Sequence, residues 1–140
     1  MERSRSEYLL VIVAVFLIWS LPLLMSSCRE KAELSTVVGQ VAKQYYDQMI
    51  NGQYDAYVDG LYQPDSIPES YRLQLIDNAK MFMEQQRREH QGLREVSVVS
   101  ATVDEDAQVA DVFLLMTFGN GDTEQVLVPM IEHDGVWFMR

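Results

Sequence analysis

The pattern of apolar and polar positions divides the chain into three parts. Residues 1–7 are polar and include Arg3 and Arg5, and residues 9–25 are apolar apart from Ser20. From residue 35 to residue 90, apolar side chains recur at helical spacing, and from residue 93 onward they alternate with polar ones. The pattern therefore predicts an apolar leader, a helical segment and a segment of β-strands.

The helical segment is punctuated by capping and breaking residues. Ser35 suits the N-cap of a first helix, and Asn51-Gly52 suits its end. Ser66-Ile67-Pro68-Glu69 has the spacing of a capping box, with proline in the first turn. Gly92 stops the last helix. The sequence predicts helices over 35–50, 54–61 and 66–90.

The last third of the chain has strand periodicity and turn residues between the runs. Asn120-Gly121 and Asp134-Gly135 are flanked by apolar runs, which is a strong hairpin signal. Because the helices precede the strands in sequence, we expect an α+β domain in which three helices pack on a four-stranded antiparallel meander. The predicted strands are 93–103, 109–118, 123–132 and 136–140.

Charge and size narrow the classes of function. The chain has 140 residues and a formal net charge of −10, all of which falls on residues 28–140. One domain of this length can bury its own core. The acidity argues against binding to nucleic acid, since phosphate recognition needs a basic surface. We therefore expect no nucleic-acid partner.

The end of the apolar run resembles the lipobox of bacterial lipoproteins, in which three apolar or small residues precede a cysteine. Here Met25-Ser26-Ser27 precede Cys28, the only cysteine of the chain, and Met25 departs from the usual branched aliphatic residue. The resemblance implies a signal peptide over 1–27, a diacylglyceryl thioether on Cys28 and a fatty acid such as palmitate on its new amino group. Residues 28–34 then form a tether to a domain over 35–140.

The alternative is an uncleaved transmembrane helix. As a helix, residues 9–25 would rise roughly 25 Å, less than a hydrocarbon core of about 30 Å. Counting residues 8–27 lengthens the span enough to keep this alternative open. The basic residues before the run place the amino terminus in the cytoplasm in either case.

A family resemblance covers residues 35–140. The leader, the helical sequence VAKQYYDQMINGQYDAYV and the terminal DGVWFM strand resemble small bacterial lipoproteins with a nuclear-transport-factor-2-like (NTF2-like), cystatin-like domain, many of unknown function. The resemblance implies a cone of helices and a curved sheet with room for a pocket, and frequently a dimer through the sheet. It implies no reaction, because this fold hosts enzymes, binding proteins and structural modules.

Tyrosines and one aspartate are the candidate pocket residues. The tyrosines either line a pocket for an apolar or carbohydrate-like ligand or fill ordinary packing between helices and sheet. Asp111 is an acid between apolar neighbours in a predicted strand, and it either faces a pocket, as the aspartate base of ketosteroid isomerase does, or lies on the wet face. The candidates are Tyr45, Tyr46, Tyr54, Tyr57, Tyr71 and Asp111.

Metal and cofactor sites are not expected. Glu132-His133-Asp134 is adjacent in sequence, but consecutive strand residues point to opposite faces and do not converge on one ion. His90 has no partner of metal-ligand spacing, and the chain has no glycine-rich phosphate loop or nucleophile elbow.

The predicted sheet is apolar on both faces. A two-residue turn at Asn120-Gly121 places Phe113, Leu115, Val126, Val128 and Met130 on one face and Val112, Leu114, Met116, Phe118, Leu127 and Ile131 on the other. Helices cover one face, so the second face predicts a homodimer or contact with another envelope protein. Alternatively, strong curvature lets the chain cover both faces itself.

These observations favour a non-catalytic module that binds a ligand or partner. It would be held on the membrane of a bacterial cell envelope by lipid on Cys28, with its domain outside the cytoplasm. The alternatives are a small-pocket enzyme of isomerase or dehydratase type and a single-pass membrane subunit with an uncleaved helix.

Overall fold

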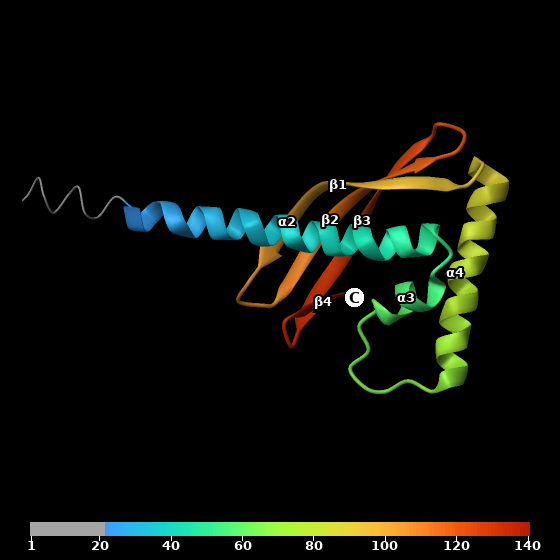
Figure 1. Ribbon diagram of the computed structural model, residues 1–140, viewed down its shortest axis with the longest axis horizontal. Helices are drawn as coiled ribbons and strands as arrows, with labels where there is room; N and C mark the ends of the chain where they lie inside the picture. The colour runs from blue at the N-terminus through green and yellow to red at the C-terminus, as the bar shows by residue number, and fades with distance from the viewer. Residues whose placement is uncertain (1–21) are drawn as a thin grey trace, which may run out of the picture. The chain divides into compact units, whose positions relative to one another are not determined.

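The computed structural model describes residues 22–140, with side chains from Cys28 onward (Figure 1). The predicted signal peptide covers residues 1–27, of which residues 1–21 lie outside the described residues. The chain divides into two compact units, residues 1–33 and 34–140, and the second contains all four strands. Within residues 22–140, no helix combines the length and apolar character needed to cross a membrane.

The first described helix, α2 (Pro22–Ile50), begins well before the predicted cap. The prediction that Ser35 starts this helix is wrong. Residues 30–34, Glu-Lys-Ala-Glu-Leu, all have high helix propensity. They therefore favour a helix that already includes the residues before Ser35. The segment expected to be a tether, residues 28–34, is therefore part of α2.

Residues 51–140 contain two further helices, α3 (Tyr54–Asp59) and α4 (Glu69–His90). The predicted capping box at Ser66 is wrong, because Pro68 is the N-cap of α4 and no side chain caps the helix. Proline disfavours helical backbone in the residue before it, Ile67, and Pro68 itself is extended (ψ 145°), so the helix starts at Glu69. The left-handed residue Gln91 (φ 61°) ends α4, directly before the predicted breaker Gly92.

The sheet is a four-stranded antiparallel meander in the order β1-β2-β3-β4, and the predicted α+β class is confirmed. A short segment after α3 runs beside β4. Leu61 pairs with Met139 in a parallel bridge, and the backbone N–H of Tyr62 donates to the Met139 carbonyl at 2.7 Å. The strands are β1 (Leu93–Asp104), β2 (Val109–Phe118), β3 (Thr123–His133) and β4 (Val136–Met139).

The β2–β3 hairpin differs from the prediction by one position in register. Val112 pairs with Val128, and the backbone N–H of Phe118 donates to the Asp122 carbonyl. The turn therefore has three residues, 119–121, with Gly121 in the left-handed region (φ 90°), and the predicted two-residue turn is wrong. Because side chains alternate along a strand, the shift exchanges the two faces of β3 relative to β2.

The corrected register keeps both sheet faces apolar. One face carries Val112, Leu114, Val128 and Met130, which are buried. The opposite face also carries apolar residues, which are partly buried or exposed, and Leu127 among them is 46% exposed. The homodimer or envelope contact through this second face stays a prediction. Its apolar residues, called the outer face below, are Val109, Phe113, Leu115, Leu127, Pro129, Ile131, Val136 and Phe138.

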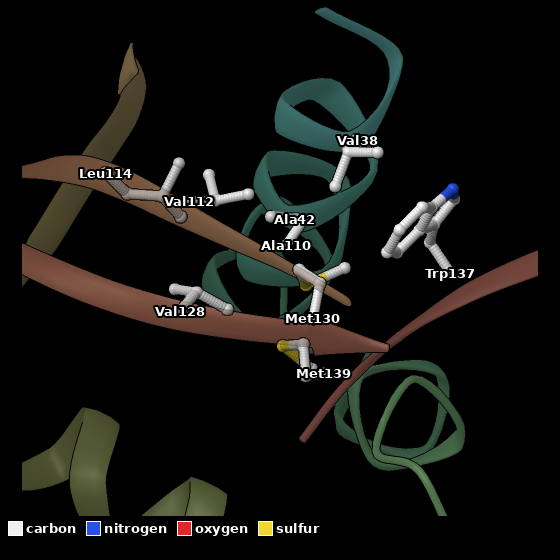
Figure 2. Packing of buried hydrophobic residues seen from close by; sticks show 9 residues of the cluster. All are labelled: Val38, Ala42, Ala110, Val112, Leu114, Val128, Met130, Trp137 and Met139. Carbon is white, nitrogen blue, oxygen red and sulfur yellow. The ribbon is translucent and has the colours of Figure 1, made fainter. Parts of the chain in front are cut away.

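The buried face packs against α2 to form the main core (Figure 2). Val38 and Ala42 of α2 are fully buried against the inner residues of β2, β3 and β4. Gly39 permits this close approach, because a Cβ at its position would lie 2.9 Å from the Val98 side chain of β1. A second cluster, built around Met49, Ala79 and Met116, joins α2 to α4 and the other end of the sheet.

Candidate functional site

A pocket of about 530 Å³ opens where α2, α3 and α4 meet the sheet. Its volume lies in the range of small-molecule sites, about 300–1,000 Å³. α4 contributes the largest share of its wall, because residues 75, 78, 79, 82 and 86 fall on one helical face. The lining residues are Tyr46, Met49, Tyr57, Leu61, Leu75, Asn78, Ala79, Phe82, Gln86, Met116, Glu124 and Val126.

Two of the predicted tyrosines lie together in this pocket. The rings of Tyr46 and Tyr57 meet edge to face, with centroids 6.1 Å apart and an interplanar angle of 85°. Burial, and to a smaller extent the neighbouring Tyr57, raises the pKa of Tyr46 to about 12. Burial also raises the pKa of Tyr57. Both phenols therefore stay neutral at physiological pH and offer aromatic faces together with a hydroxyl group.

Three polar side chains interrupt the otherwise apolar wall. Asn78 and Gln86 come from α4, and Glu124 comes from β3. Glu124 pairs with Met116 on β2, which places it on the inner face of the sheet, one step from Val126. None of the three side chains forms a hydrogen bond or ion pair within the described part of the chain.

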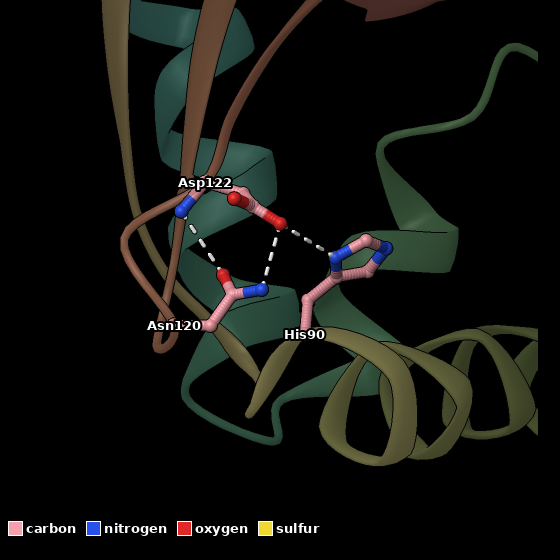
Figure 3. Close-up of polar contacts among 3 residues, drawn as sticks. All are labelled: His90, Asn120 and Asp122. Carbon is pink, nitrogen blue, oxygen red and sulfur yellow. Dashed lines mark hydrogen bonds and ion pairs between the residues drawn. The ribbon is translucent and has the colours of Figure 1, made fainter.

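Polar contacts fix the end of α4 against the β2–β3 hairpin (Figure 3). The backbone N–H of Asn120 donates to the His90 carbonyl, and that of Gly119 donates to the Gly92 carbonyl. The Asn120 side-chain amide donates to the Asp122 carboxylate at 2.7 Å, which also lies 3.4 Å from His90 Nδ1. These contacts join the end of α4 to the hairpin turn that precedes β3, the strand that carries Glu124.

The remaining candidate tyrosines lie outside this pocket. The Tyr45 hydroxyl donates to the Trp137 carbonyl at 2.9 Å, and its ring packs on Gly60. Tyr54 lines a smaller groove between α4 and the start of β1. Tyr71 is 45% exposed. The pocket therefore uses two of the five predicted tyrosines, and Tyr45 has the packing role that was the alternative.

The structure does not bring Asp111 to the pocket. It pairs with Thr102 and Pro129, is exposed, and lies on the sheet face opposite Val112. The hypothesis that Asp111 faces a pocket is therefore wrong, since every second residue of β2 points away from the helices. Sequence reasoning missed Glu124, Asn78 and Gln86. The usable signal was the position of Asn78 and Gln86 on the α4 stripe that also holds Leu75 and Phe82.

The other chemically reactive side chains are separate from the pocket. Cys28 is exposed on α2. The His133 ring contacts Tyr62 edge to face, with centroids 5.6 Å apart. Among the described residues, no group of three His, Cys, Asp or Glu side chains has the arrangement of a metal site.

Comparison with solved structures assigns the fold. The chain is similar to a crystal structure from Campylobacter jejuni that is described as a candidate NTF2-like transpeptidase. The match covers 71% of this chain and 94% of that chain, with a TM-score of 0.58 and 12% sequence identity. The architecture is therefore NTF2-like, as the sequence resemblance implied. At this identity the likeness carries the fold alone.

A second solved structure shares the architecture more loosely. It is the solution structure of a SEC-C motif containing protein from Rhodopseudomonas palustris, with a TM-score of 0.50 and 17% identity over 71% of each chain. No protein-family model and no curated protein matches this sequence. The function is therefore argued from the pocket itself.

Proposed function

We propose that this protein is a membrane-tethered module of the bacterial cell envelope that binds an apolar or aromatic small molecule without transforming it. The observation that carries the binding role is the pocket of about 530 Å³ whose wall combines Tyr46, Tyr57 and Phe82 with a few polar groups. Aromatic and aliphatic walls with isolated polar groups are typical of ligand sites. The wall residues also come from helix and strand, which hold a site more precisely than loops.

Lipid on Cys28 is the proposed means of attachment. The lipobox-like sequence and the basic, apolar leader support it. Cys28 is exposed, so its sulfur is accessible for a thioether bond. Two or more acyl chains on one residue give stable anchoring, whereas one chain gives only reversible binding.

Mass spectrometry of the membrane-extracted protein tests the attachment. We expect a chain that starts at Cys28 and carries acyl groups, and a Cys28→Ala variant that keeps its full leader. An intact amino terminus with an unmodified thiol would refute the lipid anchor and favour the single-pass membrane subunit.

A small-pocket isomerase or dehydratase is the second candidate function. Such an enzyme needs an acid or base beside a bound substrate. In the described part of the chain, the pocket offers the Glu124 carboxylate and the neutral phenols of Tyr46 and Tyr57. Glu124 is exposed rather than enclosed, and Asp111, the aspartate considered for this chemistry, is exposed on the other face of the sheet. The arrangement supports binding better than catalysis.

Binding is tested on the full chain in phosphatidylcholine nanodiscs, with methionine methyl groups labelled for NMR. Met49 and Met116 line the pocket, whereas Met130 and Met139 lie in the main core. We expect the neutral probe tryptophol to shift the first pair in a saturable way and to leave the second pair unmoved. An absence of saturable shifts at the first pair would refute the binding role.

Two matched variants separate the pocket from the rest of α4. Ala79→Leu places a larger apolar side chain in the pocket wall and is expected to abolish the shifts. Gln85→Leu adds the same side chain on the exposed side of α4 and is expected to preserve them. Equal binding of tryptophol by both variants would show that the ligand does not bind in this pocket.

A further inference from the structure

We propose that the ligand of this pocket is an organic cation, an apolar or aromatic body with an ammonium group that meets Glu124. This inference rests on the proposed binding function and adds the charge of the ligand. The starting observation is the carboxylate of Glu124, which the hairpin register places on the inner sheet face beside Val126 and Met116.

Glu124 is a carboxylate without a counter-charge at an apolar wall. No lysine, arginine or histidine is among the lining residues, and Glu124 forms no ion pair in the described part of the chain. Glu124 is exposed at the pocket wall, so water solvates its charge in the free protein and its carboxylate stays open to a ligand. A cationic ligand supplies the charge that the protein itself does not provide.

The other polar groups that line the pocket suit an ammonium donor. Asn78 and Gln86 each carry a side-chain carbonyl oxygen without a protein partner, and an ammonium group has three N–H donors and no acceptor. Three acceptors from α4 and β3 are therefore available for three donors. An anionic head group would instead meet a carboxylate of like charge.

The aromatic wall favours the same class of ligand. Tyr46 and Tyr57 present two ring systems at nearly right angles, and the negative face of a tyrosine ring attracts a cation placed over it. Because the pKa of Tyr46 is raised to about 12, its ring stays neutral and carries no phenolate charge. The chain's net charge of −10 also raises the local concentration of cations.

The proposal is tested with three indoles of similar size that differ in head group. Tryptamine carries an ammonium, tryptophol a hydroxyl and indole-3-propionate a carboxylate. Each is titrated into the full chain in phosphatidylcholine nanodiscs, with the Met49 and Met116 methyl groups as reporters. We expect tryptamine to bind about tenfold more tightly than tryptophol, a factor of ten being about 1.4 kcal/mol, and indole-3-propionate to bind most weakly.

Two charge-removing variants locate the preference. Glu124→Gln is expected to bring tryptamine to the affinity of tryptophol while leaving tryptophol unchanged. Glu95→Gln, which removes an exposed carboxylate on the outer side of β1 opposite Thr117, is expected to preserve the tenfold preference. Raising the salt concentration should also reduce the preference, because screening weakens exposed charge pairs.

The outcomes separate this proposal from the binding function on which it rests. If none of the three indoles shifts the pocket methyl groups, both proposals fail. If all three bind with equal affinity, or if indole-3-propionate binds best, the pocket is a binding site but the cation preference is refuted. A preference that survives Glu124→Gln would also overturn the role of this carboxylate.

Discussion

Gly60 is the position where adding one methyl group tests the packing most directly. Its backbone is ordinary helical (φ −79°), so glycine is required there for space and not for conformation. A Cβ at Gly60 would lie 2.4–2.8 Å from three carbons of the Tyr45 ring. Neither side yields easily, because Met139 N–H donates to the Gly60 carbonyl and the Tyr45 hydroxyl donates to Trp137.

The expected cost of Gly60→Ala follows from these distances. Carbons pack at about 3.5–4.0 Å, so the Tyr45 ring would have to retreat by about 1 Å. That movement stretches the 2.9 Å bond from its hydroxyl to the Trp137 carbonyl beyond hydrogen-bonding distance. Overpacking at about 1–3 kcal/mol and one lost hydrogen bond at about 1 kcal/mol give about 2–4 kcal/mol of lost stability.

A double-mutant cycle with Tyr45→Ala measures this effect. Urea unfolding of the full chain in detergent, followed by circular dichroism, gives the free energy of unfolding of each variant. Without the Tyr45 ring, the added methyl group has no close contact, so Gly60→Ala should then lower the free energy of unfolding only slightly. The coupling energy between the two substitutions should reach about 2 kcal/mol. A Gly60→Ala loss below about 0.5 kcal/mol, or additive losses, would refute the packing described for Tyr45.

Three further predictions follow from the core, the outer face and the hairpin. Between about pH 10 and 12 the folded state keeps a Tyr46 proton that the unfolded state loses. The free energy of unfolding should therefore fall by up to about 1.4 kcal/mol per pH unit in this range. In urea unfolding at several pH values, Tyr46→Phe should reduce this slope. If two copies associate through the outer face, light scattering should report a dimer that Leu127→Lys converts to a monomer; a wild-type monomer at high concentration contradicts the association. A Cβ at Gly119 would lie 2.2 Å from the Gln91 carbonyl oxygen, so Gly119→Ala should detach the hairpin from α4 and accelerate amide exchange at Asn120, and unchanged exchange would contradict the contact.

The strands were the most predictable part of the fold. Alternating apolar residues and the turn residues between them located each strand to within a residue or so of its observed bounds. The hairpin register was not predictable from Asn120-Gly121 alone, because the same dipeptide fits a two-residue and a three-residue turn. A turn longer by one residue shifts the pairing of β3 with β2 and exchanges the two faces of β3.

The helix starts were less predictable because capping signals compete with neighbouring residues. Ser35 has the chemistry of an N-cap, but the helix-favouring residues before it extend α2 to Pro22. Ser66 and Glu69 have the spacing of a capping box, but Pro68 between them takes the N-cap position itself. In both cases a local motif was present and the adjacent sequence decided the outcome.

The candidate site was predictable in kind but not in membership. The enrichment of tyrosines in the helical segment was compatible with an aromatic pocket and with ordinary packing, and Tyr46 and Tyr57 do line a pocket. Which tyrosines face it depends on how α2 rotates against the sheet, which no local pattern specifies. Asp111 and Glu124 are both strand acids, and only the pairing of β2 with β3 distinguishes the outward residue from the inward one.

The short pairing of Leu61 and Tyr62 with Met139 has a consequence for the behaviour of the protein at high concentration. A free strand edge is a template for another chain, and polymerisation of folded domains commonly begins there. Beside β4 that template is already occupied by the protein's own backbone. At the opposite border, β1 is interrupted between Leu93 and Glu95 and again between Val98 and Ser100, and such bulges disfavour continuous docking of a foreign strand. Both edges of the sheet therefore disfavour pairing with strands of other molecules, the step by which fibrils would grow.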